Sequence, residues 1–265
     1  NSSQKKVQLI LLKKKRINIK KIKNSEDFIL SKLGREIYEK FYKNYTLKQW
    51  GIHPKNLDKS IVGRLPIRFD RNPYYVNQKI RVMPKYGYTR LFQNMINDKK
   101  ISVQLKTDFN KVKNKIKPKH ATIYTGPPDL YFNFKYGKLD WRSLNFSFKT
   151  HRKKKIQDCV QINYPNEHKY TRKVEIKHVT RQKTKYSTLC FEYPKSKGDP
   201  YYPINNKKNK NIFKKYERLI KKAEKKNVFF EGRLAQYKYL NMDEVIERAL
   251  NLFSRIKKKY SKWII

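Results

Sequence analysis

The chain has 265 residues and a formal net charge of +45, from 66 Lys and Arg against 21 Asp and Glu. A chain of this length can bury the core of one large domain or of two small ones. The basic excess is mostly lysine scattered along the sequence, and no segment matches a nucleic-acid-binding motif, so a specific nucleic-acid role is disfavoured. No apolar stretch is long enough to span a membrane. Two cysteines without a disulfide framework favour a reducing cytoplasm.

The first predicted elements are helical. Residues 1–24 are basic and poorly patterned. Apolar residues at helical spacing, with acidic residues in the first turn, predict a helix over residues 25–43. Glycine and proline breakers make residues 45–73 loop-rich, and a short second helix is expected after Gly87.

The middle of the chain has the pattern of strands. Residues 101–126 alternate like strands, and residues 131–193 show a period of two with polar turns between the segments. The predicted strands lie at 131–134, 143–148, 160–163, 173–177 and 187–192. This alternation is typical of an antiparallel sheet.

The C-terminal part predicts a helix, a strand and a second helix. Residues 205–226 form a charged helix and residues 228–230 a buried strand. The last helix begins near Asn241, which with Glu244 fits a capping box. Its predicted apolar face comprises Val245, Ile246, Ala249, Leu250, Phe253 and Ile256. Together these elements predict an α+β chain with more than one subdomain.

Several kinds of chemistry are disfavoured by the motifs. The five histidines show no metal-ligand spacing, and there is no nucleophile elbow of the Gly-x-Ser-x-Gly type. The eight glycines are too far apart for the Gly-x-Gly-x-x-Gly loop that binds dinucleotides.

One segment has the residue types of a nucleotide site. Residues 45–75 combine stacking aromatics with Arg64 and Arg68 between breakers, which suits a nucleotide base and its diphosphate. The same aromatics could equally fill a junction between a helix and a loop. Arg172, on a predicted strand, reads by itself as a solvated side chain in so basic a protein.

Seven stretches nevertheless occur in the order of one enzyme family. They are GREIYEKF (34–41), YTLKQWG (45–51), PKYGYTR (84–90), IYTGPPD (123–129), GKLDWRSL (137–144), GDPYYP (198–203) and GRLAQYKYLNMDEVI (232–246). Together they resemble the UDP-galactopyranose mutases, flavoenzymes that interconvert the pyranose and furanose forms of UDP-galactose for cell-surface polysaccharides.

The resemblance implies a helical subdomain, an antiparallel β-sheet subdomain and the C-terminal pieces of an FAD-binding Rossmann-like α/β domain. The helical domain would comprise residues 25–60 and 85–98. The β substrate domain would comprise 61–84 and 127–204. The remaining parts of the FAD domain would be 99–126 and 205–258.

The resemblance also implies a mechanism and a set of substrate residues. Reduced FAD attacks the anomeric carbon through N5, forming a flavin–sugar adduct and displacing UDP, without net redox change. Arg64 and Arg172 would be the catalytic arginines that neutralise the diphosphate. The residues implied to bind substrate are Phe41, Tyr45, Thr46, Trp50, Tyr75, Asn163, Glu192, Tyr202 and Tyr239.

The cofactor side is implied to lie near the C-terminus. The residues implied to contact FAD are Gly126, Arg142, Gly232, Arg233, Leu240, Asn241 and Met242, and the helix starting at Asn241 would direct its N–H groups at the flavin. Asn241 stands where an Asp is common in the family.

One departure from the family is large, because its N-terminal βαβ unit with the Gly-rich loop does not occur in this sequence. We therefore expect a truncated chain with an incomplete FAD site, which retains FAD weakly and acts with a complementing N-terminal polypeptide or as a homodimer. Two other interpretations stay open: an inactive remnant that binds UDP, and a basic polyanion-binding protein.

Overall fold

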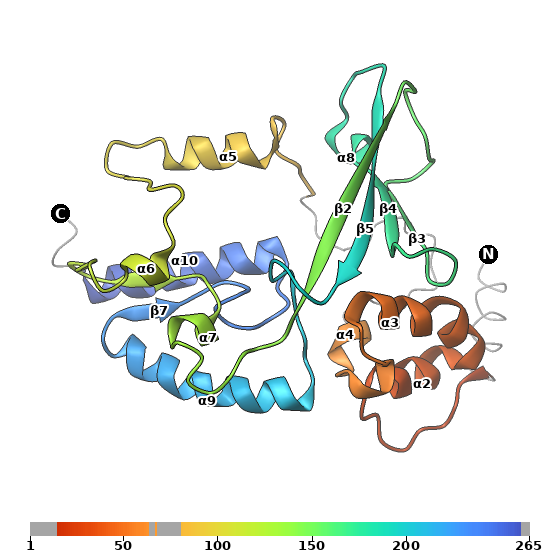
Figure 1. The fold of residues 1–265 in the computed structure, drawn as a ribbon, viewed down its shortest axis with the longest axis horizontal. Helices are drawn as coiled ribbons and strands as arrows, with labels where there is room; N and C mark the ends of the chain where they lie inside the picture. Colours follow the sequence, from red (N-terminus) through yellow and green to blue (C-terminus); the bar gives the residue numbers. More distant parts are fainter. Residues whose placement is uncertain (1–14, 64–66, 68–80, 261–265) are drawn as a thin grey trace. The chain divides into compact units, whose positions relative to one another are not determined.

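The computed structural model describes residues 15–63, 67 and 81–260, and its contacts divide the chain into two compact units. The first unit comprises Asn1–Val103 and Leu144–Ser196, and the second comprises Gln104–Ser143 and Lys197–Ile265. Figure 1 shows the elements of both. Each unit is described by itself.

Three consecutive helices form the described residues 25–50 of the first unit. Helix α2 (Ser25–Ile37) is capped by Asn24, whose Oδ1 accepts a hydrogen bond of 2.8 Å from the N–H of Asp27. A π-helical turn, η1 (Tyr38–Lys43), leads into α3 (Asn44–Trp50), which ends at Gly51 in the left-handed conformation. Shorter elements follow: η2 (Pro54–Asn56), α4 (Ser60–Gly63) and α5 (Gly87–Ile96).

The core of these helices matches the predicted apolar spacing only in part, because Ile29 and Leu33 are buried but Phe41 is 60% exposed. Ile29, Leu30, Leu33 and Tyr38 are buried together. Gly34 has a φ of +80°, and a side chain there would collide with the main-chain oxygen of Lys15. The prediction that residues 45–50 are loop was wrong, because α3 continues the helical run up to Gly51.

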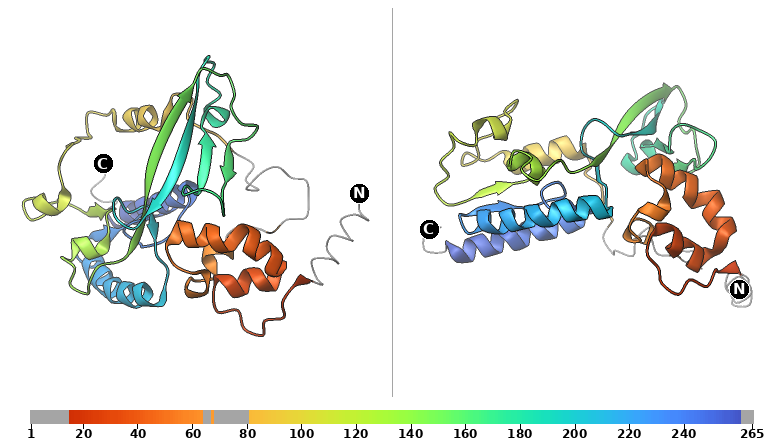
Figure 2. Two further views of the ribbon diagram at one scale, coloured as in Figure 1. Left: turned by 45° about the vertical axis from the view of Figure 1, so that its right-hand side comes forward. Right: turned by 60° about the horizontal axis from the view of Figure 1, so that its bottom comes forward.

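An antiparallel sheet completes the first unit. Strands β3 (Gln161–Asn163), β4 (Arg172–Glu175), β5 (Ser187–Lys195) and β2 (Trp141–His151) lie in this order, and α8 (Lys177–Thr180) follows β4. The left view of Figure 2 shows these strands side by side. The predicted antiparallel pairing is confirmed.

The second unit has a small parallel sheet between two helices. Strand β1 (Thr122–Tyr124) pairs in parallel with β7 (Val228–Phe230). Helix α9 (Lys207–Glu224) packs on the face that carries Tyr124 and Phe230, and α10 (Met242–Lys259) lies on the other face, so that β7 runs between the two helices (Figure 1). The predicted helices over 205–226 and after Asn241 are thus confirmed.

The direction of α10 follows from the contacts of its last turn. Tyr260 Oη donates to His120 O at 3.0 Å, and Lys259 Nζ donates to Asn227 Oδ1 at 2.6 Å. These partners immediately precede β1 and β7, so the end of α10 lies at the amino ends of both strands. Its beginning therefore lies toward their carboxyl ends.

The remaining elements correct two predictions. Residues 101–121 hold α6 (Phe109–Val112) and turns, so that only 122–124 of the predicted strand region pairs. Residues 131–134 are not a strand, because Pro127 and Pro128 start the short helix α7 (Pro128–Tyr131). Strand β6 (Tyr202–Pro203) pairs antiparallel with Trp141 and Arg142 at the start of β2.

Much of the apolar face predicted for α10 is exposed. Leu252 is buried against the sheet, whereas a neighbouring stripe is 59–62% exposed and consists of Met242, Ile246, Leu250 and Phe253. Among the described helices, none combines the length and apolarity needed to cross a membrane.

Candidate functional site

The predicted site residues fall into two groups, one in each unit. The first unit carries Phe41, Tyr45, Thr46, Trp50, Asn163, Arg172 and Glu192. The second unit carries Gly126, Arg142, Tyr202, Gly232, Arg233, Tyr239, Leu240, Asn241 and Met242. Arg64 and Tyr75 lie outside the described residues.

The predicted base-binding residues of the first unit lie on η1 and α3. Phe41, on the π-helical turn, is 60% exposed and Tyr45 is half-buried, whereas Thr46 and Trp50 are buried. π-Helical turns are rare and are frequent at functional sites. The turn and helix therefore present two aromatic rings at the surface over a packed inner side.

The three other residues of this group form one row across the sheet. Asn163 on β3 pairs with Arg172 on β4, and Arg172 pairs with Glu192 on β5. Directly opposed residues of antiparallel strands project from the same face. A polar row of an amide, a guanidinium and a carboxylate is thus built by strand register, and α3 packs against β5 beside it.

An ion pair lies within this row. Arg172 Nε is 2.9 Å from Glu192 Oε2, and both side chains are largely buried. Burial raises the pKa of Glu192, and the charge of Arg172 opposes the rise. The pair holds the guanidinium against the sheet, and breaking it would leave the partner's charge buried.

In the second unit the candidate residues gather where the parallel strands end. Gly126 follows β1 and Gly232 follows β7. Gly232 has a φ of +99°, and a Cβ there would meet no atom of the described chain within 4 Å. Ligands of α/β sheets bind beyond the carboxyl ends of the strands, which is the position of both glycines.

Next to Gly232, one arginine lies on two tyrosines. The rings of Tyr202 and Tyr239 are stacked, with centroids 5.5 Å apart and planes 7° apart. The Arg233 guanidinium lies 4.2 Å from the centroid of Tyr239 and 5.1 Å from that of Tyr202. Its Nε and Nη2 are buried and have no hydrogen-bond partner among the described residues.

A second arginine adjoins this stack. Arg142 is directly opposite Tyr202 in the β2–β6 pair, and Tyr201 donates to the main-chain oxygen of Arg142 at 3.0 Å. Arg142 is buried, and burial lowers the pKa of its guanidinium. Two arginines and two tyrosines predicted for different ligands thus form one cluster.

The start of α10 is capped as the sequence predicted. Glu244 Oε2 accepts a hydrogen bond of 2.7 Å from the N–H of Asn241. Leu240 is buried and Met242 is exposed. Because α10 begins toward the carboxyl ends of β1 and β7, its N-terminus adds a positive partial charge near that edge of the sheet.

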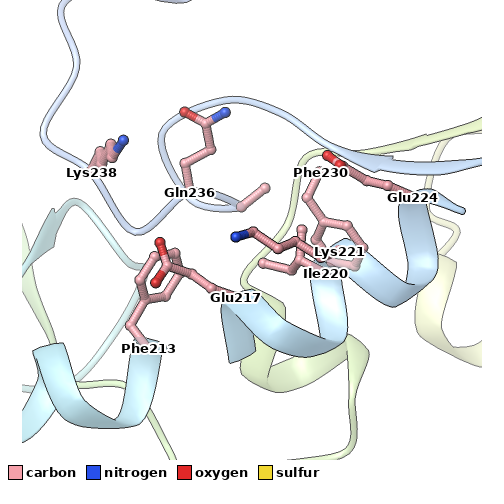
Figure 3. Close-up of a pocket in the computed structure, with 9 residues that line it drawn as sticks. Phe213, Glu217, Ile220, Lys221, Glu224, Phe230, Gln236 and Lys238 are labelled. Carbon is pink, nitrogen blue, oxygen red and sulfur yellow. The ribbon is translucent and has the colours of Figure 1, made fainter. Parts of the chain in front are cut away.

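A hollow of about 200 Å³ in the second unit lies apart from these residues. It has Phe213, Ile220 and Phe230 as its floor and charged side chains of α9 and Lys238 around it (Figure 3). None of the described site residues lines it, and its volume is below the ~300 Å³ of small-molecule pockets. In the described chain no group of three His, Cys, Asp or Glu is placed to hold a metal ion.

Two charged residues that hold the local structure of the matched stretches were missed in the sequence. Lys48 lies inside the YTLKQWG stretch and binds main-chain carbonyls of the hairpin before Arg172. Asp129, in the IYTGPPD stretch, is buried and its Oδ2 accepts from Leu139 N at 2.9 Å. Both residues could have been found from the sequence, because each is the single charge in an otherwise uncharged motif.

Comparison with known proteins agrees with these motifs. Residues 40–239 match the family model described as UDP-galactopyranose mutase. A probable UDP-galactopyranose mutase of Klebsiella pneumoniae is 36% identical over 230 residues, which are 85% of this chain and 59% of that protein. A dTDP-fucopyranose mutase of Escherichia coli is 35% identical over 234 residues, covering 85% of this chain and 62% of that protein.

A further relative and a solved structure agree. The UDP-galactopyranose mutase of Mycoplasma genitalium is 35% identical, over 82% of this chain and 58% of its own length. The crystal structure of a reduced UDP-galactopyranose mutase shares the fold, with a TM-score of 0.68, 14% identity, and coverage of 96% of this chain and 74% of that one. The chain thus spans about three fifths of the length of these curated relatives. Because the family model matches 200 of the 265 residues (40–239), the chain belongs to the UDP-galactopyranose mutase family.

Proposed function

We propose that this chain forms the substrate side and part of the flavin side of a mutase that interconverts UDP-galactopyranose and UDP-galactofuranose. The observation that carries the proposal is the Arg233 guanidinium, stacked on Tyr239 and Tyr202 with two buried donors that no described residue satisfies. Buried donors of this kind cost free energy unless a ligand accepts their hydrogen bonds. A diphosphate or a flavin carbonyl supplies such acceptors.

The first unit would bind the nucleoside diphosphate. Tyr45 and Phe41 would stack on the uracil, with the buried Thr46 and Trp50 behind them. Arg172 would bind the diphosphate, together with Arg64 and Tyr75. Asn163 and Glu192, in the same row as Arg172, would contact the sugar.

The second unit would hold the flavin end of FAD. The chemistry of this side fits the cofactor, because the cluster offers a cationic face, two stacked rings and a helix N-terminus. Arg142, Arg233, Gly126, Gly232 and residues 240–242 would contact it. Tyr202 and Tyr239 would reach the substrate diphosphate.

The proposed roles divide the work of the reaction between the cofactor and the chain. Reduced FAD, when bound, would supply the nucleophile N5 for the anomeric carbon of the sugar. Arg172 and Arg64 would stabilise the negative charge that UDP gains as it leaves, and the aromatic walls would exclude water. Neither arginine needs to change protonation, since guanidinium groups stay charged at working pH.

We further propose that another polypeptide segment completes the flavin half. The described parallel sheet has two strands, which is unusually few. Ile123 of β1 is 53% exposed, and it lies on the same face as Phe229 of β7, which α10 covers. The exposed stripe of α10 is on the same side of the sheet. A segment that adds a parallel strand beside β1 and a helix beside α10 would cover both, and the cytoplasm suits the two free cysteines, Cys159 and Cys190.

Titration of the purified chain with UDP and with FAD tests the proposal. We expect UDP to bind and FAD to bind only weakly. The comparison ligand is dTDP, because the Escherichia coli relative is a dTDP-fucopyranose mutase. Conversion of UDP-galactofuranose under dithionite is expected only when the completing segment is added. Failure to bind UDP, together with DNA binding that falls steeply with salt, would favour the polyanion-binding alternative. UDP binding without conversion after full reconstitution would favour the inactive remnant.

A further inference from the structure

The hairpin that carries Arg172 is tied to helix α3 by one ammonium group. Lys48 Nζ lies 2.5 Å from the main-chain oxygen of Tyr164, 2.7 Å from that of His168 and 3.4 Å from that of Tyr170. An ammonium has three protons and no acceptor, so three converging carbonyls match its capacity. Burial lowers the pKa of Lys48, which agrees with an ammonium withdrawn from water.

The loop over residues 164–170 is folded so that these carbonyls converge. The rings of Tyr164, His168 and Tyr170 pack on one another with centroids 4.6–5.0 Å apart, and Tyr170 also contacts Phe191 of β5 at 5.1 Å. Without the ammonium, the aligned carbonyl dipoles would repel one another. The aromatic cluster therefore shapes the loop, and Lys48 neutralises the oxygen atoms that this shape brings together.

A second tie joins the same loop to α3 and to the preceding turn η1. Asn44 Nδ2 donates to Asn166 Oδ1 at 2.9 Å, and Asn166 Nδ2 donates to the main-chain oxygen of Lys40 at 3.1 Å. These bonds are exposed and neutral, so each contributes less than the charge-assisted contacts of Lys48, two of which are partly buried.

The loop leads directly into the polar row on both sides. Tyr164 donates through its N–H to Thr171 O at 2.8 Å, and Thr171 donates to Glu192 O at 2.9 Å. Asn163 and Arg172 flank these residues and pair with each other. The position of the loop relative to α3 thus sets the position of Arg172 relative to Tyr45.

We propose that Lys48 is a positioning residue that fixes the diphosphate-binding row to the base-binding helix, so that base and diphosphate are recognised at one fixed spacing. The proposal rests on the proposed nucleotide-binding function. It assigns to Lys48 no contact with the nucleotide, only control of the geometry between two groups that make contact.

The test is a double-mutant cycle with Lys48→Met and Arg172→Ala, measured by titration calorimetry on the full chain with UDP and with uridine. In Lys48→Met we expect uridine affinity to stay within about twofold and UDP affinity to fall about tenfold. Arg172→Ala should then cost far less in the Lys48→Met background than in the original chain, because Arg172 no longer reaches the diphosphate.

Two variants separate geometry from charge. Lys43→Met removes the same charge from the same helical run but breaks only a pair with Glu39 at 2.8 Å, so UDP affinity should stay within about twofold. Lys48→Arg keeps the charge, but its planar group cannot converge on three carbonyls, so it should resemble Lys48→Met. Full UDP affinity in Lys48→Arg would show that charge alone matters and would overturn the proposal.

Other outcomes also decide the matter. Equal losses for uridine and UDP, or additive effects of Lys48→Met and Arg172→Ala, would show a general structural role and overturn the proposal while UDP binding by the original chain stands. An original chain that binds neither ligand would overturn the proposed function, and this inference with it. If Lys48→Met does not fold, Asn166→Ala must give a smaller loss of the same kind.

Discussion

The two units each bury a carboxylate, and the two carboxylates lie in opposite environments. Glu175, on β4 of the first unit, accepts hydrogen bonds from the N–H groups of Ile156 and Gln157 and from Ser187 Oγ. These donors lower the pKa of Glu175, although burial alone would raise it. Asp129, on α7 of the second unit, accepts a hydrogen bond from Leu139 N, but burial outweighs its backbone hydrogen bonds and raises the pKa of its carboxyl.

The same contrast extends to the candidate site. In the first unit the guanidinium of Arg172 has a carboxylate partner, and the hairpin carbonyls share the ammonium of Lys48. In the second unit Arg233 keeps two buried donors without a partner among the described residues, and an apolar stripe of α10 is exposed. In these groups the first unit pairs its charges with its own residues, whereas the second leaves two buried guanidinium donors and an apolar helix face uncovered by the described residues.

The largest effect is expected from Arg172→Ala. It removes the cation proposed for the diphosphate and leaves Glu192 buried without its partner, so UDP affinity should fall about 100-fold, measured by calorimetry. Lys173→Ala is the matched control, since the neighbouring strand position projects from the opposite face, and it should change affinity by less than about threefold. If UDP affinity is unchanged in Arg172→Ala, the proposal that this sheet binds the diphosphate is wrong.

The two carboxylates predict opposite responses to neutralisation. Because the folded-state pKa of Glu175 is lowered, its stabilisation is present above about pH 4.5 and is lost as the pH falls through that lowered pKa. Glu175→Gln should therefore lower the free energy of unfolding by about 2 kcal/mol at pH 7, because an amide cannot accept all three hydrogen bonds. The loss should be smaller in acid.

The raised pKa of Asp129 reverses the sign. Its ionised form costs stability above the raised pKa, and this cost is relieved as the pH falls. Asp129→Asn keeps an acceptor for Leu139 N and should change stability by less than about 1 kcal/mol at pH 7. Urea unfolding at two pH values checks both variants, and equal losses for both would contradict the contrast.

A smaller effect is expected from Arg233→Met. Affinity for added FAD should fall about tenfold, because the donors and the cation–π contacts are lost. Stability of the chain without ligand should rise or stay unchanged, since the unsatisfied buried donors are removed. Arg248→Met is the control with the reverse expectation, which is an unchanged affinity for FAD and a loss of stability. The reason is that Arg248 Nη1 donates to Gln236 Oε1 at 2.9 Å. Fluorescence titration and thermal melts measure the two quantities.

The smallest effect is expected on the exposed stripe. Leu250→Ala should change the free energy of unfolding by less than about 0.5 kcal/mol, whereas Leu252→Ala, two positions away and buried, should cost about 2–5 kcal/mol. A large cost for Leu250→Ala would mean that a second copy covers the stripe in solution. Dependence of that cost on protein concentration would then identify a dimer.

Local signals in the sequence predicted some elements well and others poorly. The capping pair of Asn241 and Glu244 placed the start of α10 correctly. Helix α3 was mistaken for loop, because Gly51 and Pro54 follow it closely and its aromatic residues do not repeat as a core stripe. The alternation over 131–134 suggested a strand, although Pro128 at the first helical position starts a turn of helix.

The sequence by itself determined the family, the antiparallel pairing of the middle strands and the residue types of the site. These depend on motifs and on periodicity, which are local properties of the chain. Only the tertiary structure decided that Asn163, Arg172 and Glu192 form one row, because strand register is set by pairing between residues that are 9 and 20 positions apart in the chain. It also decided that Lys48 joins this row to α3 and that Arg233 lies on Tyr202 and Tyr239, since such contacts depend on packing between distant segments.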